Sequence, residues 1–263
     1  MLDLTPLNIS LMLAASTAAG LVDAIVGGGG LIQLPALFIF LPRELAASIP
    51  LVFGTNKLSS LCGTSVAAWQ YSRRVRIPWA SIRPATIAAF FFSALGVRVL
   101  QSVRSEFLRP LTLVLLIAVA IYTYSRKSLG HLHAPKFLAD HERWMAVAVG
   151  VVIGFYDGFF GPGVGSFWLI AFVTVLGYDL VRASAHARVM NFASNLAALL
   201  FFAAVGKVAW LPGLVMGAGQ FIGGRIGSHL ALNRGARFIR PIFLLMASLV
   251  ALKLIYASLS RGP

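Results

Sequence analysis

The sequence predicts an all-α polytopic membrane protein with about eight transmembrane segments, arranged as two homologous four-segment repeats. Its composition indicates the class: of 263 residues, 59% are hydrophobic and 11% are charged, and the mean hydropathy is +0.85. A soluble domain carries about 25% charged residues, so most of this chain is expected to lie in lipid. An acid with a glycine cluster occurs twice, as Asp23 with Gly27–Gly30 and as Asp157 with Gly161–Gly165, which indicates the repeat.

The segments follow from the length of a span, because a helix needs about 20 apolar residues to cross the hydrocarbon core. The predicted segments are 7–26, 45–71, 80–101, 108–125, 144–160, 180–205, 208–230 and 239–258. Two further apolar arms, 31–41 and 164–178, directly follow the glycine clusters. The first arm is too short to cross alone, so we expect broken or re-entrant helices at the glycine clusters.

The similarity of the two copies continues beyond the glycine clusters. Chance matching of apolar residues does not readily produce the aligned pairs, because many of them are polar, aromatic or proline residues. Among them are Asn56 with Asn191, Ser59 with Ser194, Trp79 with Trp210, and Arg109-Pro110 with Arg240-Pro241. We therefore expect a first repeat at 1–125, a polar linker at 126–143 and a second repeat at 144–263.

The relative orientation of the two copies stays open at the level of sequence. The first copy has a basic loop around Arg73 and Arg76, whereas the matching loop of the second copy holds only Lys207. The basic loop of the second copy is the next one, around Arg234 and Arg237. Because basic loops favour the cytoplasm, this shift is typical of inverted repeats. Four spans in each copy, an even number, would instead return the chain to the same side of the membrane and keep the copies parallel.

The net charge of +14 has a topological origin, because the basic residues lie mostly between apolar stretches. We expect the lipid bilayer and small anions as partners, and no nucleic acid. The single cysteine, Cys62, excludes an internal disulfide and is expected to pack as a small hydrophobe. Residues 1–10 carry no cluster of positive charge, so the first apolar segment is expected to remain as a membrane helix.

The two glycine clusters are the first candidate anion-binding elements. Each glycine costs about 1 kcal/mol relative to alanine inside a helix, and a proline removes a backbone donor. A helix break exposes N–H groups at the start of the next half-helix, where the helix dipole also favours an anion. Close helix packing through small residues is the alternative role. The candidates in these clusters are Gly27, Gly28, Gly29, Gly30, Gly161, Pro162, Gly163, Gly165 and Ser166.

Asp23 and Asp157 each lie about one helical turn before a glycine cluster. A carboxylate in lipid is costly, so each aspartate is expected either to carry a proton during transport or to brace the broken backbone. His186, in the second copy, is a further candidate for the same two roles.

Polar side chains within the apolar segments are the second set of candidate binding groups. Asn191 and Asn195 are four residues apart and share a helix face, and Asn56 matches Asn191 in the first copy. Lys57 can hold an anion with its ammonium group, and Arg188 is a second cationic candidate one turn before Asn191. The alternatives are interhelical hydrogen bonding by the amides and snorkelling of Lys57 to the interface.

Sequence motifs of enzymes and metal sites are absent. The chain has no Walker loop, HExxH motif, nucleophile elbow or paired CxxC, and His131, His133 and His141 lack firm ligand spacing. We expect no metal, no cofactor and no enzymatic activity.

Several motifs together resemble the sulfite exporter TauE/SafE family of membrane permeases, in particular its uncharacterised bacterial branch. The resemblance covers roughly residues 10–258. It is carried by Asp23, Gly27–Pro35, Thr55–Leu58, Gly154–Phe167, Ala183–Ala187 and Asn191–Asn195. It implies a duplicated four-segment unit and the transport of sulfur-containing anions such as sulfite or sulfonates.

The predicted function is that of a secondary transporter in the bacterial cell inner (cytoplasmic) membrane. It is expected to move a small sulfur-containing anion by alternating access around a midplane site between the two glycine breaks, with proton or other ion coupling. A passive anion channel that uses the same residues is the alternative. A membrane-embedded enzyme and a purely structural role are less favoured.

Overall fold

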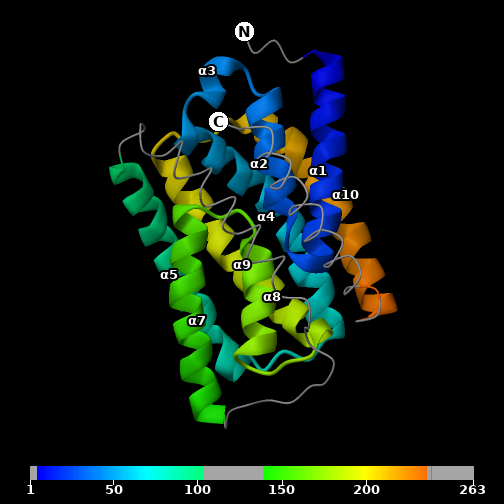
Figure 1. Ribbon diagram of the computed structural model, residues 1–263, viewed down its shortest axis with the longest axis vertical. Coiled ribbons are helices and arrows are strands. Elements are labelled where there is room, and N and C mark those ends of the chain that lie inside the picture. The colour runs from blue at the N-terminus through cyan, green and yellow to red at the C-terminus, as the bar shows by residue number, and fades with distance from the viewer. Residues whose placement is uncertain (1–4, 104–138, 236–237, 239–263) are drawn as a thin grey trace, which may run out of the picture.

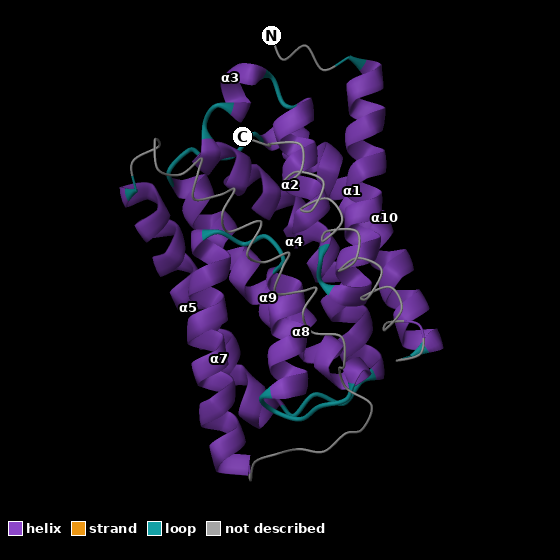
Figure 2. Ribbon diagram, viewed as in Figure 1, coloured by secondary structure: helices purple, strands orange, loops and turns teal. Residues whose placement is uncertain are grey.

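The computed structural model describes residues 5–103, 139–235 and 238, and in these ranges it is helical and without strands (Figures 1 and 2). The helices of the first part are α1 (Pro6–Val26), α2 (Gly29–Phe40), the short α3 (Arg43–Ala46), α4 (Ile49–Arg74) and α5 (Trp79–Ser102). Those of the second part are α7 (Ala139–Phe159), α8 (Val164–Thr174), α9 (Leu180–Ala204) and α10 (Trp210–Arg234). Three of them, α1, α5 and α9, are long and apolar enough to cross a membrane, and α2 and α8 are shorter apolar helices.

Most predicted segments correspond to helices with nearly the same bounds, which is consistent with a multi-pass membrane protein. The segment predicted at 45–71 is divided into α3 and α4, because Pro50 lies in the first turn of α4 and cannot continue a preceding helix. The last residues of the predicted linker are helical, since α7 begins at Ala139. The segments predicted at 108–125 and 239–258, together with His131 and His133, lie outside the described residues, so the four-segment repeat stays a prediction.

Both glycine clusters break the helical course of the chain. Gly27 ends α1 with φ of 87°, and Gly161 and Gly163 precede α8 with φ of 90° and 73°. Backbone angles of this kind are readily adopted only by glycine. In Figure 1, α2 turns back beside α1, and α8 turns back beside α7. Each break therefore forms the tip of a helical hairpin.

The two hairpins enter the bundle from opposite ends. In Figure 1, α1 descends from the end where α3 lies, whereas α7 ascends from the other end, and α4 and α9 also run in opposite directions. The long arm of each hairpin packs against the other copy: α1 contacts α10, and α7 contacts α5. Between them, α4 and α9 contact each other, so the described helices of the two halves of the chain are interlocked, and the corresponding helices run in opposite directions.

Small residues allow the hairpin arms to approach their partners closely. A Cβ atom on Gly219 would lie 2.6 Å from the Leu13 carbonyl oxygen of α1, and Gly223 and Gly227 face the same helix. On the other side of the bundle, a Cβ atom on Gly154 of α7 would lie 2.7 Å from Ala89 of α5. Gly219, Gly223 and Gly227 therefore form a helix-packing stripe on α10, with α1 as its partner.

Candidate functional site

The tips of the two hairpins touch each other in the middle of the bundle. The Ser166 backbone N–H donates to the Gly27 carbonyl oxygen at 3.1 Å, and the Ser166 hydroxyl donates to the Val26 carbonyl oxygen at 2.9 Å. A Cβ atom on Gly165 would lie 2.6 Å from the Gly27 Cα atom, which is too close for any side chain. Glycine is required at both positions because two backbones cross there.

A small polar cavity lies between these two tips and the middle of α4 and α9. Its volume is about 20 Å3, and a cavity needs roughly 10–15 Å3 to hold one water. The cavity therefore has room for about one water. The lining residues are Asp23, Gly27, Gly30, Asn56, Lys57, Ser60, Gly161, Gly163, Val164, Gly165, Asn191 and Asn195.

Lys57 is buried at this cavity and does not extend to the membrane interface. Its ammonium forms an ion pair with Asp157 Oδ1 and donates to Asn195 Oδ1 at 3.1 Å. The exposed fractions of the Lys57 and Asp157 side chains are only 3% and 0%. Asn195 Nδ2 in turn donates to Asn191 Oδ1 at 3.1 Å, so one network joins α4, α7 and α9.

Asp23 occupies the corresponding place at the other hairpin tip. Its Oδ1 atom accepts from the Gly29 backbone N–H at 3.3 Å, and its Oδ2 atom lies 3.3 Å from Arg188 Nη1. The Arg188 side chain is fully buried, and its Nε and Nη2 atoms have no hydrogen-bond partner among the described residues. The Gly29 contact connects the end of α1 to the start of α2 across the helix break, as expected for an aspartate that braces the broken backbone.

Each aspartate pairs with a cation that belongs to the other copy. Lys57 of α4 meets Asp157 of α7, and Arg188 of α9 meets Asp23 of α1. The two cations do not align with each other, because Lys57 matches Phe192 and Arg188 precedes Phe192 by one turn. Two carboxylates and two basic groups therefore form two ion pairs at and beside the cavity.

Some predicted site residues shape the tips without lining the cavity. Gly28 and Gly29 form the turn into α2, and Ser166 links the tips through the two hydrogen bonds described above. The Pro162 carbonyl oxygen accepts from the Tyr156 hydroxyl at 2.9 Å. Sequence reasoning missed this role of Tyr156, since a tyrosine beside an aspartate gives no signal for a contact across a turn.

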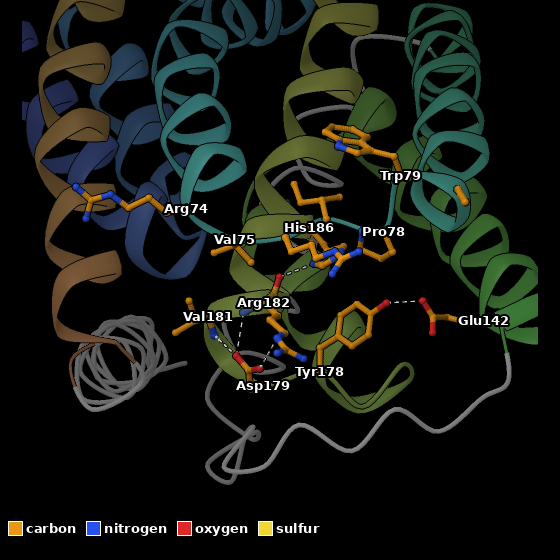
Figure 3. Close-up of a pocket in the computed structure, with 13 residues that line it drawn as sticks. Arg74, Val75, Pro78, Trp79, Glu142, Tyr178, Asp179, Val181, Arg182 and His186 are labelled. Carbon is orange, nitrogen blue, oxygen red and sulfur yellow. Dashed lines mark hydrogen bonds and ion pairs between the residues drawn. The ribbon is translucent and has the colours of Figure 1, made fainter.

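His186 lies away from the hairpin tips, in a larger pocket of about 830 Å3 where the α4–α5 and α8–α9 connections meet (Figure 3). Its ring packs against Tyr178 with 4.7 Å between the ring centroids. The Tyr178 hydroxyl donates to Glu142 Oε1 at 2.5 Å. Burial and the Glu142 carboxylate both raise the pKa of Tyr178, so the hydroxyl stays a donor at neutral pH. The structure thus separates His186 from Asp23 and Asp157.

Comparison with known proteins gives a consistent set of relatives. The family description "Sulfite exporter TauE/SafE" matches residues 12–254. The probable membrane transporter protein YfcA of Escherichia coli K12 is 37% identical over 260 residues, covering 97% of this chain and 92% of the relative. A probable membrane transporter protein of Haemophilus influenzae is 35% identical over 256 residues, covering 94% of both chains. No solved structure matches.

A third relative, the probable membrane transporter protein ORF9 of Sinorhizobium, is 34% identical over 257 residues, covering 97% of this chain and 95% of the relative. With the apolar helices, these matches indicate a multi-pass membrane transporter. They are also compatible with a protein that is not an enzyme.

Proposed function

Because the chain belongs to the sulfite exporter TauE/SafE family, we propose that it is a secondary transporter for a small sulfur-containing anion such as sulfite or a sulfonate. The observation that carries this proposal is the cavity between the two hairpin tips, with the buried ammonium of Lys57 on its wall. A buried ionisable group within a membrane bundle is costly and commonly marks the path of an ion or substrate.

The donors around the cavity fit a tetrahedral or pyramidal oxyanion. The ammonium of Lys57 supplies charge, and the amides of Asn191 and Asn195 supply donors without charge. The α2 and α8 helices begin beside the cavity, directly after their N-cap residues Gly28 and Gly163, so the positive ends of their dipoles lie near the bound anion. Backbone N–H groups at the tips add further donors, as in transporters whose broken helices meet at the midplane.

Proton coupling follows from the Lys57–Asp157 pair. In the described state the ammonium is occupied by the Asp157 carboxylate, so it cannot give its full charge to an anion. Protonation of Asp157 removes the competing charge, and Lys57 then holds the anion in place of the carboxylate. Proton and anion therefore bind together, and release of the proton returns Lys57 to Asp157 and expels the anion.

Alternating access is supported by the opposite directions of the two hairpins. The α1–α2 hairpin opens to the end of the bundle with α3, and the α7–α8 hairpin opens to the other end (Figure 1). A movement of one hairpin relative to α4 and α9 can therefore open the cavity to one side at a time. A cavity of about 20 Å3 is too small for an oxyanion, so binding of the anion requires such a movement.

The basic residues support an orientation in the bacterial inner membrane. Arg73, Arg74, Arg76 and Arg182 lie at the end of the bundle where α8 ends, and Arg143 lies near the start of α7 at the same end. By the positive-inside rule we place this end in the cytoplasm and the beginning of α1 on the outer side.

The test is flux in proteoliposomes that contain the purified protein. Wild-type protein is expected to accumulate labelled sulfite or a sulfonate when a pH gradient is imposed, and Asp157→Asn is expected to lose the dependence on the gradient. Unchanged pH-dependent flux in Asp157→Asn would reject the coupling role. A flux that never exceeds electrochemical equilibrium would identify a passive channel instead.

A further inference from the structure

A second cavity, of about 600 Å3, lies on the flank of the bundle between the final turns of α4 and α10. It is separate from the cavity between the hairpin tips and shares no lining residue with it. We call it the α4–α10 groove. Its lining residues are Trp69, Gln70, Arg73, Arg74, Arg225, Ile226, His229 and Leu230.

The polar part of the α4–α10 groove is strongly basic. Three arginines and one histidine line it, and none of the described residues that line it is acidic. Within the part of the chain that the structure describes, no carboxylate lies within salt-bridge distance of Arg73, Arg74 or Arg225. The positive charge of the groove is therefore available for an anionic ligand.

Two of these arginines are held in place by neighbouring side chains. The Arg73 guanidinium lies over the Trp69 ring, 5.2 Å from its centroid. Arg74 Nη1 donates to Asn233 Oδ1 at 2.6 Å, and Asn233 Nδ2 lies 2.8 Å from His229 Nε2. In Figure 3, the Arg74 side chain points away from Tyr178 and His186 and towards α10. Arg73 and Arg74 thus reach the groove from α4, and Arg225 reaches it from α10.

The apolar part of the groove lies on the exposed surface of the bundle. Trp69 is 55% exposed and Ile226 is 46% exposed, and Ile222 continues the same exposed side of α10 one turn further from the end. An exposed tryptophan one turn from a pair of arginines is typical of the interface between headgroups and hydrocarbon. The groove therefore offers cations at headgroup level and apolar surface immediately above them.

We propose that the α4–α10 groove binds the phosphate headgroup of an anionic phospholipid from the leaflet on the basic side of the membrane. Arg73 and Arg225 bind the phosphate oxygens, Arg74 and His229 complete the cationic wall, and the acyl chains lie along Trp69 and Ile226. Basic pockets between transmembrane helices on the cytoplasmic side suit such headgroups, because the guanidinium fork matches a phosphate in geometry and charge.

A lipid bound in the groove would stabilise the fold. The α10 helix packs between α1 and α4, and a headgroup shared by Arg73 and Arg225 would fasten its exposed side to α4. Binding to the native protein alone raises its apparent stability by mass action.

The experiment is a thermal-shift measurement on the full-length protein in neutral detergent, with phosphatidylglycerol, phosphatidylcholine or inorganic phosphate added at equal concentration. For wild-type protein we expect phosphatidylglycerol to raise Tm by about 5–10 °C at roughly 100 times Kd. Phosphatidylcholine and inorganic phosphate are expected to have little effect. Equal shifts with both lipids, or a full shift with phosphate alone, would overturn the proposal.

Variants identify the groove as the source of the shift. Arg73→Gln/Arg225→Gln changes two exposed side chains, so the protein is expected to fold and to respond to both lipids alike. Arg83→Gln is the matched control, because Arg83 is exposed near the start of α5 at the same end of the bundle and does not line the groove. A full response to phosphatidylglycerol in the double variant would also overturn the proposal.

Discussion

Lys57 on α4 and Asp157 on α7 form a buried ion pair that joins the first half of the chain to the second. The two residues are a hundred positions apart, and their side chains meet at the tip of a broken helix. Together with the Arg188–Asp23 pair, this contact makes the middle of the bundle an electrostatically balanced site. Stability and anion binding are therefore expected to depend on the same charges.

A double-mutant cycle on Lys57→Met and Asp157→Leu tests the contribution of this pair to stability. Either single change leaves a buried charge without its partner, which costs about 3–5 kcal/mol. The double variant is expected to be destabilised by much less than the sum of the two, because both charges are removed. The measurement is thermal unfolding in detergent, with Arg182→Gln as the control.

Arg182 is a suitable control because its ion pair with Asp179 is half-exposed, and such pairs contribute about 0–1 kcal/mol. Additive effects of Lys57→Met and Asp157→Leu would show that the two charges do not interact in the folded protein.

Gly165→Ala tests the crossing of the two hairpin tips. The new methyl group would lie 2.6 Å from the Gly27 Cα atom, so the tips have to separate, at a cost of about 1–3 kcal/mol for overpacking. Loss of transport together with a lowered Tm is the expected result. Gly206→Ala is the comparison: Gly206 has a positive φ of 69° but no atom within 4 Å of the added methyl group, whereas Gly165 lies within α8 and has no positive φ. Gly206→Ala carries backbone strain only and is expected to leave transport intact, whereas an unchanged Tm and unchanged transport in Gly165→Ala would contradict the close crossing.

Ser166→Ala tests the side-chain link between the tips. The Ser166 hydroxyl donates to the carbonyl oxygen of Val26 across the tip, and its loss is expected to cost about 1 kcal/mol. Ser184→Ala removes an equally buried hydroxyl that donates to the Leu180 carbonyl oxygen of its own helix and also contacts the Tyr71 side chain, without a bond to either tip. Transport rates in proteoliposomes are expected to fall for Ser166→Ala and to change little for Ser184→Ala. A larger loss of transport rate in Ser184→Ala than in Ser166→Ala would show that transport does not depend on the Ser166 hydrogen bond between the tips.

The orientation of the bundle predicts which cysteines a membrane-impermeant maleimide can label in intact cells. In a Cys62→Ser background, Ser10→Cys lies at the exposed beginning of α1 and is expected to be labelled from outside. Ser72→Cys lies at the exposed basic end of α4 and is expected to react only after the cells are opened. Labelling of Ser72→Cys from outside, with Ser10→Cys protected until the cells are opened, would indicate the opposite orientation in the membrane.

The sequence was sufficient to predict the helices and the two breaks, because apolar length and glycine clusters are local signals. It was also sufficient to select Lys57, Asn191 and Asn195, since a polar side chain in a long apolar helix is costly unless it meets a polar partner or a ligand. The pairing of Lys57 with Asp157 could not be predicted from the sequence. Alignment of the copies sets Lys57 against Phe192, and nothing local shows that the helices cross between copies.

The orientation of the copies stayed open in the sequence for a related physical reason. The prediction of parallel copies counted four membrane crossings in each copy, with the broken helix as one of them. In the structure, α1 with α2 and α7 with α8 form hairpins that turn back towards the end from which they entered (Figure 1). A hairpin of this kind does not count as a single crossing, so the count of four does not determine the orientation. His186 was grouped with the aspartates because it lies close in sequence to Asn191. Residues 186 and 188 of a helix point in nearly opposite directions, so Arg188 reaches Asp23 while His186 faces Tyr178.

The most direct measurement is anion binding by the purified protein, read as a thermal shift with sulfite, thiosulfate, a short sulfonate and a carboxylate of the same charge. At least one sulfur oxyanion is expected to raise Tm in a concentration-dependent way, more strongly at low pH, and the shift is expected to disappear in both Lys57→Gln and Asn195→Ala. An absence of any shift across these anions, or an undiminished shift in Lys57→Gln, would contradict an anion site between the hairpin tips.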